Sequence, residues 1–252
     1  MTQSTGRPVA IVTGGGTGMG RSVAIDLAKD HDVVIVGRRK ERLDEVADLA
    51  GIAVTPIAAD VSDVDAVEAL VGSVMRLHKR IDVLVNCVGV RAARVLTTTD
   101  LREAAEVWTG QLKANATSHF LMCYAVAKHM TRPGGRIVNF SSEGVYTGGI
   151  RPGNPTYIAA KGAVQAMTLC LARELSPEGI TVNVVVPGII GDTDMSSQLT
   201  DEGRADYAAE TIVGRIGRPE EVAAGVRYLV SPEAGFVTGQ MLTINGGAVL
   251  GR

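Results

Sequence analysis

The sequence predicts an α/β fold: a single doubly wound domain, spanning residues 1–252, with a seven-stranded parallel sheet. Short runs rich in β-branched residues alternate with longer segments of helical periodicity, which is the pattern of strands joined by crossover helices. The runs are apolar along their whole length, as strands covered on both faces must be. No composition break, linker or internal repeat divides the chain, so one domain is the simplest interpretation.

The seven predicted strands each end in a turn where a functional motif can lie. In chain order they are VAIVTG (9–14), DVVIVGR (32–38), IAVTPIAAD (52–60), IDVLVNC (81–87), GRIVNFSS (135–142), ITVNVVVPG (180–188) and QMLTING (240–246). In doubly wound sheets ligands bind outside the carboxyl ends of the strands, where the strand order reverses. The candidate motifs below follow such strand ends, so the sequence predicts one cleft.

Bulk properties exclude several classes of function. The net charge of -2 and the lack of a basic stripe argue against nucleic acid as a partner. The longest apolar stretch, VVVPGII, is far too short to span a membrane, and no signal peptide precedes the first strand, so we expect a cytoplasmic protein without a membrane partner. The cysteines and histidines lack metal-ligand spacing, so no disulfide framework and no metal site are expected.

The first predicted strand runs into a glycine-rich turn, TGGGTGMG, at residues 13–20. Glycines at a strand-to-helix junction let the backbone approach a pyrophosphate, and the helix N-terminus offers unpaired N–H groups and a positive dipole end. The turn does not match GxGxxG. A nucleoside triphosphatase loop would need lysine where Arg21 stands. The turn therefore predicts a dinucleotide site.

Gly14, Gly18 and Gly20 match the TGxxxGxG pattern of the short-chain dehydrogenase/reductase family, which the chain resembles from this turn to its end. The resemblance implies a Rossmann-type domain that binds NAD(P). It also implies cofactor contacts along the turn, in the segment AADVSD and in NCVG, where the family usually has NNAG. The residues concerned are Gly14, Gly16, Thr17, Gly18, Met19, Gly20, Asp60, Val61, Asn86 and Gly89, with Cys87 and Val88 as departures from the family pattern.

The end of the second predicted strand, VVIVGRRKE, indicates which cofactor is used. An acidic residue there would bind the ribose 2'-hydroxyl and repel a 2'-phosphate. Gly37, Arg38 and Arg39 instead supply room and positive charge, which favours NADPH over NADH. The alternative is that Arg38 and Arg39 simply begin a solvated helix.

Tyr157 is the predicted proton donor of a carbonyl reductase. The carbonyl oxygen gains negative charge as hydride reaches the carbon, so it needs a proton donor and hydrogen bonds. A nearby ammonium lowers the pKa of a tyrosine, and residues four apart share one helix face. Tyr157 has Lys161 at that offset, whereas Tyr146 has Ile150. By the resemblance, Tyr157 and Lys161 also contact the cofactor.

The predicted partners of Tyr157 come from two other segments. Ser141 and Ser142 end the fifth strand and point to opposite sides, so only one faces Tyr157. The family pattern implies Ser142 at the substrate oxygen, and an asparagine, here Asn115, that holds a water in a proton relay. The segment 143–156 is about two residues longer than is usual in the family; it opens with Tyr146, a candidate substrate contact.

Two later segments also resemble the family. In NVVVPGIIGDTDM the resemblance implies cofactor contacts from Pro187, Gly188, Ile190 and Thr193, the last one residue later than usual. The final segment, from 214 to 247, resembles the helix and strand that build a tetramer interface, which implies a homotetramer.

These features together predict an NADPH-dependent carbonyl reductase, nearest to 3-oxoacyl-[acyl-carrier-protein] reductases. Its substrate would be a small carbonyl compound, carried on acyl-carrier protein or coenzyme A. Arg132 and Arg173 match positions on which such enzymes dock the carrier, although an ordinary solvated surface explains both equally well. One alternative is a dehydrogenase of a secondary alcohol, sugar or secondary metabolite. Another is a cofactor-binding regulator, which Tyr157 and Lys161 argue against.

Overall fold

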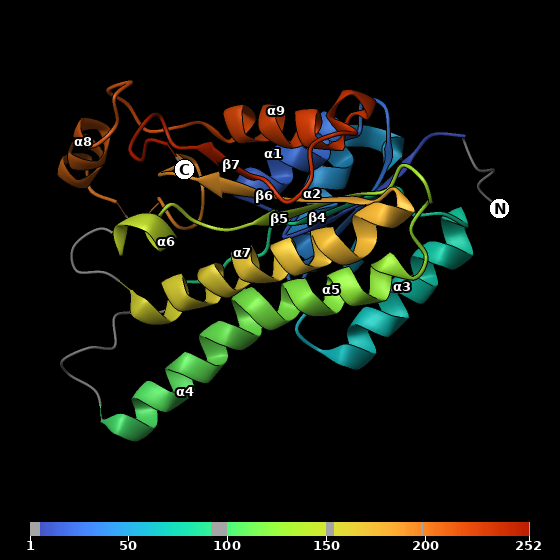
Figure 1. Ribbon diagram of the computed structural model, residues 1–252, viewed down its shortest axis with the longest axis horizontal. Helices are drawn as coiled ribbons and strands as arrows, with labels where there is room; N and C mark the ends of the chain where they lie inside the picture. Colours follow the sequence, from blue (N-terminus) through green and yellow to red (C-terminus); the bar gives the residue numbers. More distant parts are fainter. Residues whose placement is uncertain (1–5, 92–99, 150–153, 198, 252) are drawn as a thin grey trace.

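The computed structural model describes residues 6–91, 100–149, 154–197 and 199–251, and its strands form one parallel sheet. The order across the sheet is β3-β2-β1-β4-β5-β6-β7 (Figure 1). The strands are β1 (Val9–Thr13), β2 (Asp32–Gly37), β3 (Val54–Ala58), β4 (Val83–Asn86), β5 (Arg136–Phe140), β6 (Thr181–Pro187) and β7 (Met241–Ile244). Each lies inside a predicted run, so the predicted doubly wound, seven-stranded Rossmann-type sheet is confirmed.

Helices cover both faces of the sheet (Figure 1). One face carries α1 (Gly18–Leu27), α2 (Lys40–Ala50) and α9 (Pro219–Val230), and the other α3 (Val64–His78), α5 (Ser118–Ala127) and α7 (Pro155–Leu175). The remaining helices of the described chain are α4 (Leu101–Leu112), α6 (Gly144–Thr147) and α8 (Asp201–Ala209), with short segments at Gly51–Ala53, Lys113–Thr117, Ser176–Glu178 and Pro232–Ala234. None of the described helices is both long and apolar enough to cross a bilayer.

Alternation along each strand divides the core into two apolar layers. On β1, Ala10 and Val12 pack with α1, α2 and α9, whereas Val9 and Ile11 pack with α3, α5 and α7. All four are at most 2% exposed. Full burial of a valine or isoleucine side chain is worth about 1.5–3 kcal/mol, so these layers fix the strand register that the site depends on.

The strand order reverses at β1, which pairs with β2 on one side and β4 on the other. Val12 is opposite Ile35 of β2 and Val85 of β4. The crossovers from β1 and from β4 therefore leave in opposite directions, and a crevice opens between their carboxyl ends. The glycine turn follows β1 and the segment 87–91 follows β4, so both border this crevice.

At the amino ends of the strands, on the side of the sheet away from the cavity, the Asp82 carboxylate joins three segments. It accepts hydrogen bonds from the Val9 amide (2.8 Å), from the Arg80 guanidinium (2.7 and 2.8 Å) and from the Thr131 hydroxyl (2.7 Å). Burial raises the pKa of Asp82, but the hydrogen bonds from Arg80, Val9 and Thr131 outweigh it and hold the pKa below its ordinary value. The charged form therefore stabilises the start of β1 and β4.

We expect Asp82→Asn to lower the free energy of unfolding by about 2 kcal/mol at neutral pH, because the amide cannot replace charge-assisted acceptance from three donors. The folded pKa lies below the unfolded value of about 3.9, so this stabilisation is present above that value and is lost as pH falls through the folded pKa. Urea unfolding at a series of pH values, from neutral to acid, measures the free energy of unfolding of both proteins. Plotted against pH, the values for the variant and the wild type should converge in acid. A constant difference across the pH range would contradict the role assigned to the carboxylate.

Candidate active site

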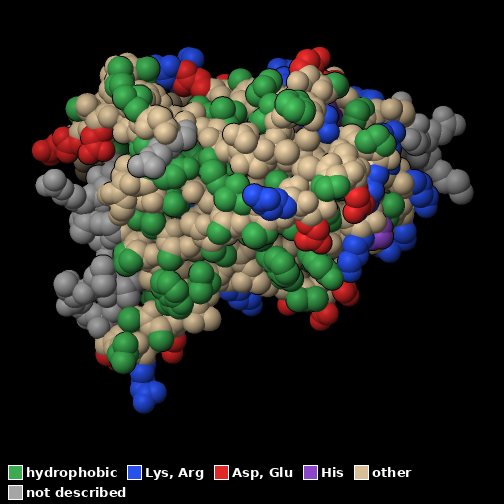
Figure 2. Space-filling view, in the orientation of Figure 1, with side chains coloured by type: hydrophobic (Ala, Val, Ile, Leu, Met, Phe, Trp, Pro, Cys, Tyr) green, Lys and Arg blue, Asp and Glu red, His purple; other side chains and the backbone are tan. Residues whose placement is uncertain are grey.

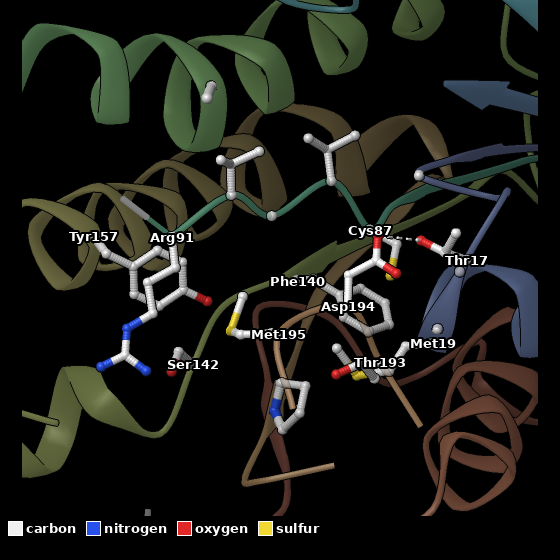
Figure 3. Close-up of a pocket in the computed structure, with 18 of the residues that line it drawn as sticks. Thr17, Met19, Cys87, Arg91, Phe140, Ser142, Tyr157, Thr193, Asp194 and Met195 are labelled. Carbon is white, nitrogen blue, oxygen red and sulfur yellow. Dashed lines mark hydrogen bonds between the residues drawn. The ribbon is translucent and has the colours of Figure 1, made fainter. Parts of the chain in front are cut away.

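A cavity of about 1060 Å³ occupies the crevice at the carboxyl ends of the strands. Tyr157 and Ser142 lie at one end of it, and Thr17 and Asp194 at the other (Figure 3). Most of the predicted site residues line it. These are Gly14, Gly16, Thr17, Gly18, Met19, Gly20, Arg38, Arg39, Asp60, Val61, Gly89, Ser142, Tyr157, Lys161, Pro187, Gly188, Ile190 and Thr193.

The glycine turn fits the pyrophosphate of a dinucleotide. A Cβ on Gly20 would lie 2.2 Å from the carbonyl oxygen of Gly14, so only glycine allows this tight turn. Gly14 has a φ of +70° and its amide donates to the Val36 carbonyl at 2.8 Å. Thr17 precedes α1 without capping it through its side chain, which leaves the first amides of the helix for an anion.

The end of the cavity beside β2 is bordered by basic side chains. The Arg39 guanidinium donates to the Asp194 carboxylate at 2.6 Å, which links the end of β2 to the loop after β6. Both side chains are more than half exposed, at 58% and 63%, so the pair contributes about 0–1 kcal/mol. Hydrogen bonds from the amide and hydroxyl of Ser62 lower the pKa of Asp60, and the charge of Arg38 adds to the effect.

Tyr157 and Lys161 lie one turn apart on α7, which the Asn154 side chain caps by accepting the Tyr157 amide at 3.1 Å. The Lys161 side chain is 2% exposed, and its Nζ donates to the carbonyls of Phe140 (2.9 Å) and Val88 (3.1 Å). Nζ lies 6.0 Å from the centroid of the Tyr157 ring. The two side chains therefore lie close together on the cavity wall.

Burial dominates the protonation of both groups. It lowers the pKa of Lys161 to about 8, and raises the pKa of Tyr157 to about 12, with the Arg91 cation and the Ser142 hydroxyl acting in the opposite direction. The prediction that the pKa of Tyr157 is lowered is therefore wrong, because burial outweighs the nearby charges. At neutral pH the phenol carries its proton, whereas the ammonium of Lys161 lies within reach of deprotonation. A protonated phenol at a cavity wall can donate to an oxygen.

The serine doublet divides as strand alternation predicts. Ser141 is buried; its hydroxyl donates to the Lys161 carbonyl at 2.9 Å and accepts from the Gln165 amide at 3.0 Å. Ser142 lines the cavity and its Oγ accepts from the Gly144 amide at 3.2 Å. Only Ser142 is thus available to a ligand.

Asn115 lies behind the cavity wall, in the π-helical segment Lys113–Thr117 between α4 and α5. It is fully buried; its Oδ1 accepts the Val90 amide and its Nδ2 donates to the Val90 carbonyl, both at 2.9 Å. A Cβ on Gly89 would be 3.7 Å from the Lys161 Nζ and 4.0 Å from the Asn115 Oδ1. Asn115 therefore holds the chain beside Lys161, and π-helical widenings often mark functional sites.

Two other predicted site residues do not line the cavity. Asn86 points into the sheet, where its amide donates to the Asn139 Oδ1 at 2.9 Å. Tyr146 lies on the short helix α6 and is not among the described lining residues. Of the lengthened segment 143–156, residues 150–153 lie outside the described part of the chain.

Four charged residues that line the cavity were not predicted from the sequence: Arg42, Arg91, Glu143 and Asp194. Burial raises the pKa of Glu143 to about 7, and the charge of Glu210 adds to this. The sequence signal that could have identified Glu143 is a charged residue directly after the serine doublet at a strand end.

Among the described residues, no group of three or more His, Cys, Asp or Glu side chains is placed to hold a metal ion.

Comparison with known proteins assigns this geometry to a family. Residues 14–249 match the family profile described as enoyl-(acyl carrier protein) reductase. The chain is 39% identical to the short-chain reductase protein NovJ of Streptomyces niveus, over 95% of this chain and 93% of that protein. It is 36% identical to the 3-oxoacyl-[acyl-carrier-protein] reductase FabG of Vibrio cholerae, over 95% and 96%.

The chain belongs to the short-chain dehydrogenase/reductase family. A solved structure of a member described as glucose/ribitol dehydrogenase, from Brucella melitensis, superposes with a TM-score of 0.89 at 31% identity, covering 97% of each chain. This short-chain dehydrogenase/reductase is therefore an oxidoreductase, and its family implies an NAD(P) cofactor, which the glycine turn fits.

We expect Gly20→Ala to weaken binding of both NADPH and NADH about 10-fold or more, because the added methyl group would displace the Gly14 carbonyl from the turn. Fluorescence titration with each cofactor measures the change, and circular dichroism checks the fold. Gly72→Ala in α3 is the matched control, since its Cβ would meet only the end of the Arg76 side chain at 3.4 Å. Equal affinity of Gly20→Ala and the control would contradict the assignment of the turn.

Proposed function

We propose that this protein reduces the carbonyl group of a 3-oxoacyl thioester, or of a related ketone, to an alcohol with NADPH. The observation that carries the proposal is the grouping of Tyr157, Ser142 and the buried Lys161 on the wall of one cavity. Bound NADPH would supply the hydride that attacks the carbonyl carbon. The protein would supply the proton and the hydrogen bonds to the oxygen.

Tyr157 and Ser142 would have different roles at the carbonyl oxygen of the substrate. As negative charge grows there, the Tyr157 phenol donates its proton and the Ser142 hydroxyl donates a hydrogen bond. The phenolate left behind is stabilised by the Lys161 ammonium 6.0 Å from the ring. Because two main-chain carbonyls hold Nζ in place, the lysine needs no reorganisation during the reaction.

Lys161 also starts the return path of the proton. Its lowered pKa of about 8 lets it pass a proton to the phenolate and regain one from solvent. Asn115 supports this step by holding the Val90 backbone, because that backbone continues from the Val88 carbonyl that binds Nζ. We assign Asn115 a positioning role in the relay.

Arg38 and Arg39 support the preference for NADPH. Both line the adenosine end of the cavity, where no acidic residue follows β2. Arg39 is paired with Asp194, and a 2'-phosphate carries more charge than one carboxylate. The 2'-phosphate would therefore displace the Asp194 carboxylate and bind the Arg39 guanidinium.

Two surface features bear on partners. Arg173 is exposed, whereas Arg132 is bound to the carbonyls of Ala127 and Met130 and to Glu178. Arg173 is thus the better docking position for a carrier protein, the kind of substrate that the name of the Vibrio cholerae relative specifies.

Hydrophobic side chains are visible on the face shown in Figure 2. The large hydrophobic side chains exposed on α4 and α5 are Leu101, Trp108, Phe120 and Tyr124, and they support the proposed homotetramer.

We expect Tyr157→Phe to lower kcat about 100-fold or more on every accepted substrate, because the proton donor is lost. Its affinity for NADPH should change little. The assay follows NADPH oxidation against a panel of 3-oxoacyl thioesters, simple ketones and quinones. Tyr228→Phe, a change at an exposed tyrosine of α9, is the control. Full activity of Tyr157→Phe would show that another group donates the proton.

We expect Arg39→Ala to weaken NADPH binding about 10-fold while leaving NADH binding almost unchanged. Asp194→Asn should tighten NADPH binding, because it removes the carboxylate that competes for Arg39. Fluorescence titration at low and high salt measures both effects. If both cofactors lost affinity equally in Arg39→Ala, the phosphate assignment would be wrong.

A further inference from the structure

Glu143 is a cavity residue with no role in the reaction described above. It directly follows Ser142, and its amide donates to the Pro187 carbonyl at 3.1 Å, which fixes its backbone against the end of β6. Its side chain lies over Gly188, where a Cβ would be 2.9 Å from the Glu143 Oε2. Glu143 also lines the cavity, one residue from the serine that is proposed to bind the carbonyl oxygen.

The carboxyl group of Glu143 has no partner among the described residues. Its Oε2 is buried and unpaired, and neither oxygen accepts a hydrogen bond or joins an ion pair in the described chain. Burying a carboxylate without a donor is strongly unfavourable. The group responds with a pKa raised to about 7. The residue as a whole is half-buried, and only Oε2 is both buried and unpaired.

The charges around Glu143 favour a cation. The charged group that acts on it is Glu210, next to the end of α8, whose negative charge raises the pKa further. The basic residues of this end of the cavity, Arg91 and Lys161, do not contribute to this shift: Arg91 acts on Tyr157, and Lys161 is held by two main-chain carbonyls. Two acidic side chains without a neutralising base create a negative potential, which attracts a positively charged ligand group.

We propose that Glu143 binds a primary ammonium group of the substrate, so that the site selects amino ketones or amino-substituted 3-oxoacyl thioesters. An ammonium would give the buried oxygen its missing donor and favour the ionised carboxylate. Because Ser142 and Glu143 both line the same cavity, the amine should stand within a few bonds of the carbonyl carbon. This assignment rests on the proposed function, because it takes Ser142 as the carbonyl site.

Matched ligands can isolate the charge. 3-Amino-1-phenylpropan-1-one and butyrophenone differ only by an ammonium in place of a methyl group, as do 2-amino-1-phenylethanone and propiophenone. Calorimetry with the oxidised cofactor present measures the affinity of each, at about pH 8, where most of the carboxyl group is ionised. The wild type should bind the amine of at least one pair about 10-fold more tightly. Glu143→Gln, which keeps the shape but not the charge, should abolish that preference.

Glu202→Gln on α8 is the matched control, because Glu202 is exposed and is not among the described lining residues. It should keep the preference for the amine. No preference in the wild type, or an unchanged preference in Glu143→Gln, would overturn the proposal. Turnover of the same ligands, with and without Tyr157→Phe, reports on the reaction separately. Failed reduction beside a Glu143-dependent preference would contradict the proposed function but not the amine site.

Discussion

The buried ammonium of Lys161 is the interaction on which the arrangement of the site depends. Its Nζ is bound by the carbonyl of Phe140 at the end of β5 and by the carbonyl of Val88 just after β4. Those two strands are neighbours in the sheet, and the lysine itself comes from α7. One cation therefore fixes the relative positions of two strand ends and the helix that carries Tyr157. The lowered pKa of Lys161 is the consequence of burying it.

A set of polar contacts around Lys161 keeps these parts in register. The Ser141 hydroxyl binds the Lys161 carbonyl, so the inward serine anchors α7 while its neighbour Ser142 faces the cavity. Asn115 holds Val90 with two hydrogen bonds. The reactive end is thus built on strand ends and a helix, whereas the adenosine end is held by one exposed ion pair. We infer that the first is preorganised and the second adapts to the cofactor.

Local pattern was sufficient to predict the sheet and the pairing of Tyr157 with Lys161, whereas most of the predicted cavity residues came from the family resemblance. Buried parallel strands are continuous apolar runs, and the offset between Tyr157 and Lys161 places both on one face of a helix whatever surrounds it. The same strand alternation separated Ser141 from Ser142. Such features depend on residues that are near in the sequence, so they can be predicted without knowledge of the packing.

The features that were missed depend on long-range packing. Nothing near Glu143 in the sequence indicates that Gly188 will lie against its carboxylate, or that Glu210 will raise its pKa. Arg39 and Asp194 are far apart in the chain and meet only across the crevice. Asn86 was expected at the cofactor, but the polar group of Asn139 on the neighbouring strand binds its amide within the sheet.

The central claim, that a buried Lys161 organises the reactive end, can be tested by titrating the lysines one by one. NMR of protein with isotope-labelled lysine side chains gives a pKa for each resonance. The account predicts one resonance that titrates near pH 8 and is absent from Lys161→Met. If the resonance lost in Lys161→Met titrated with the others, Lys161 would be solvated and the account would be wrong.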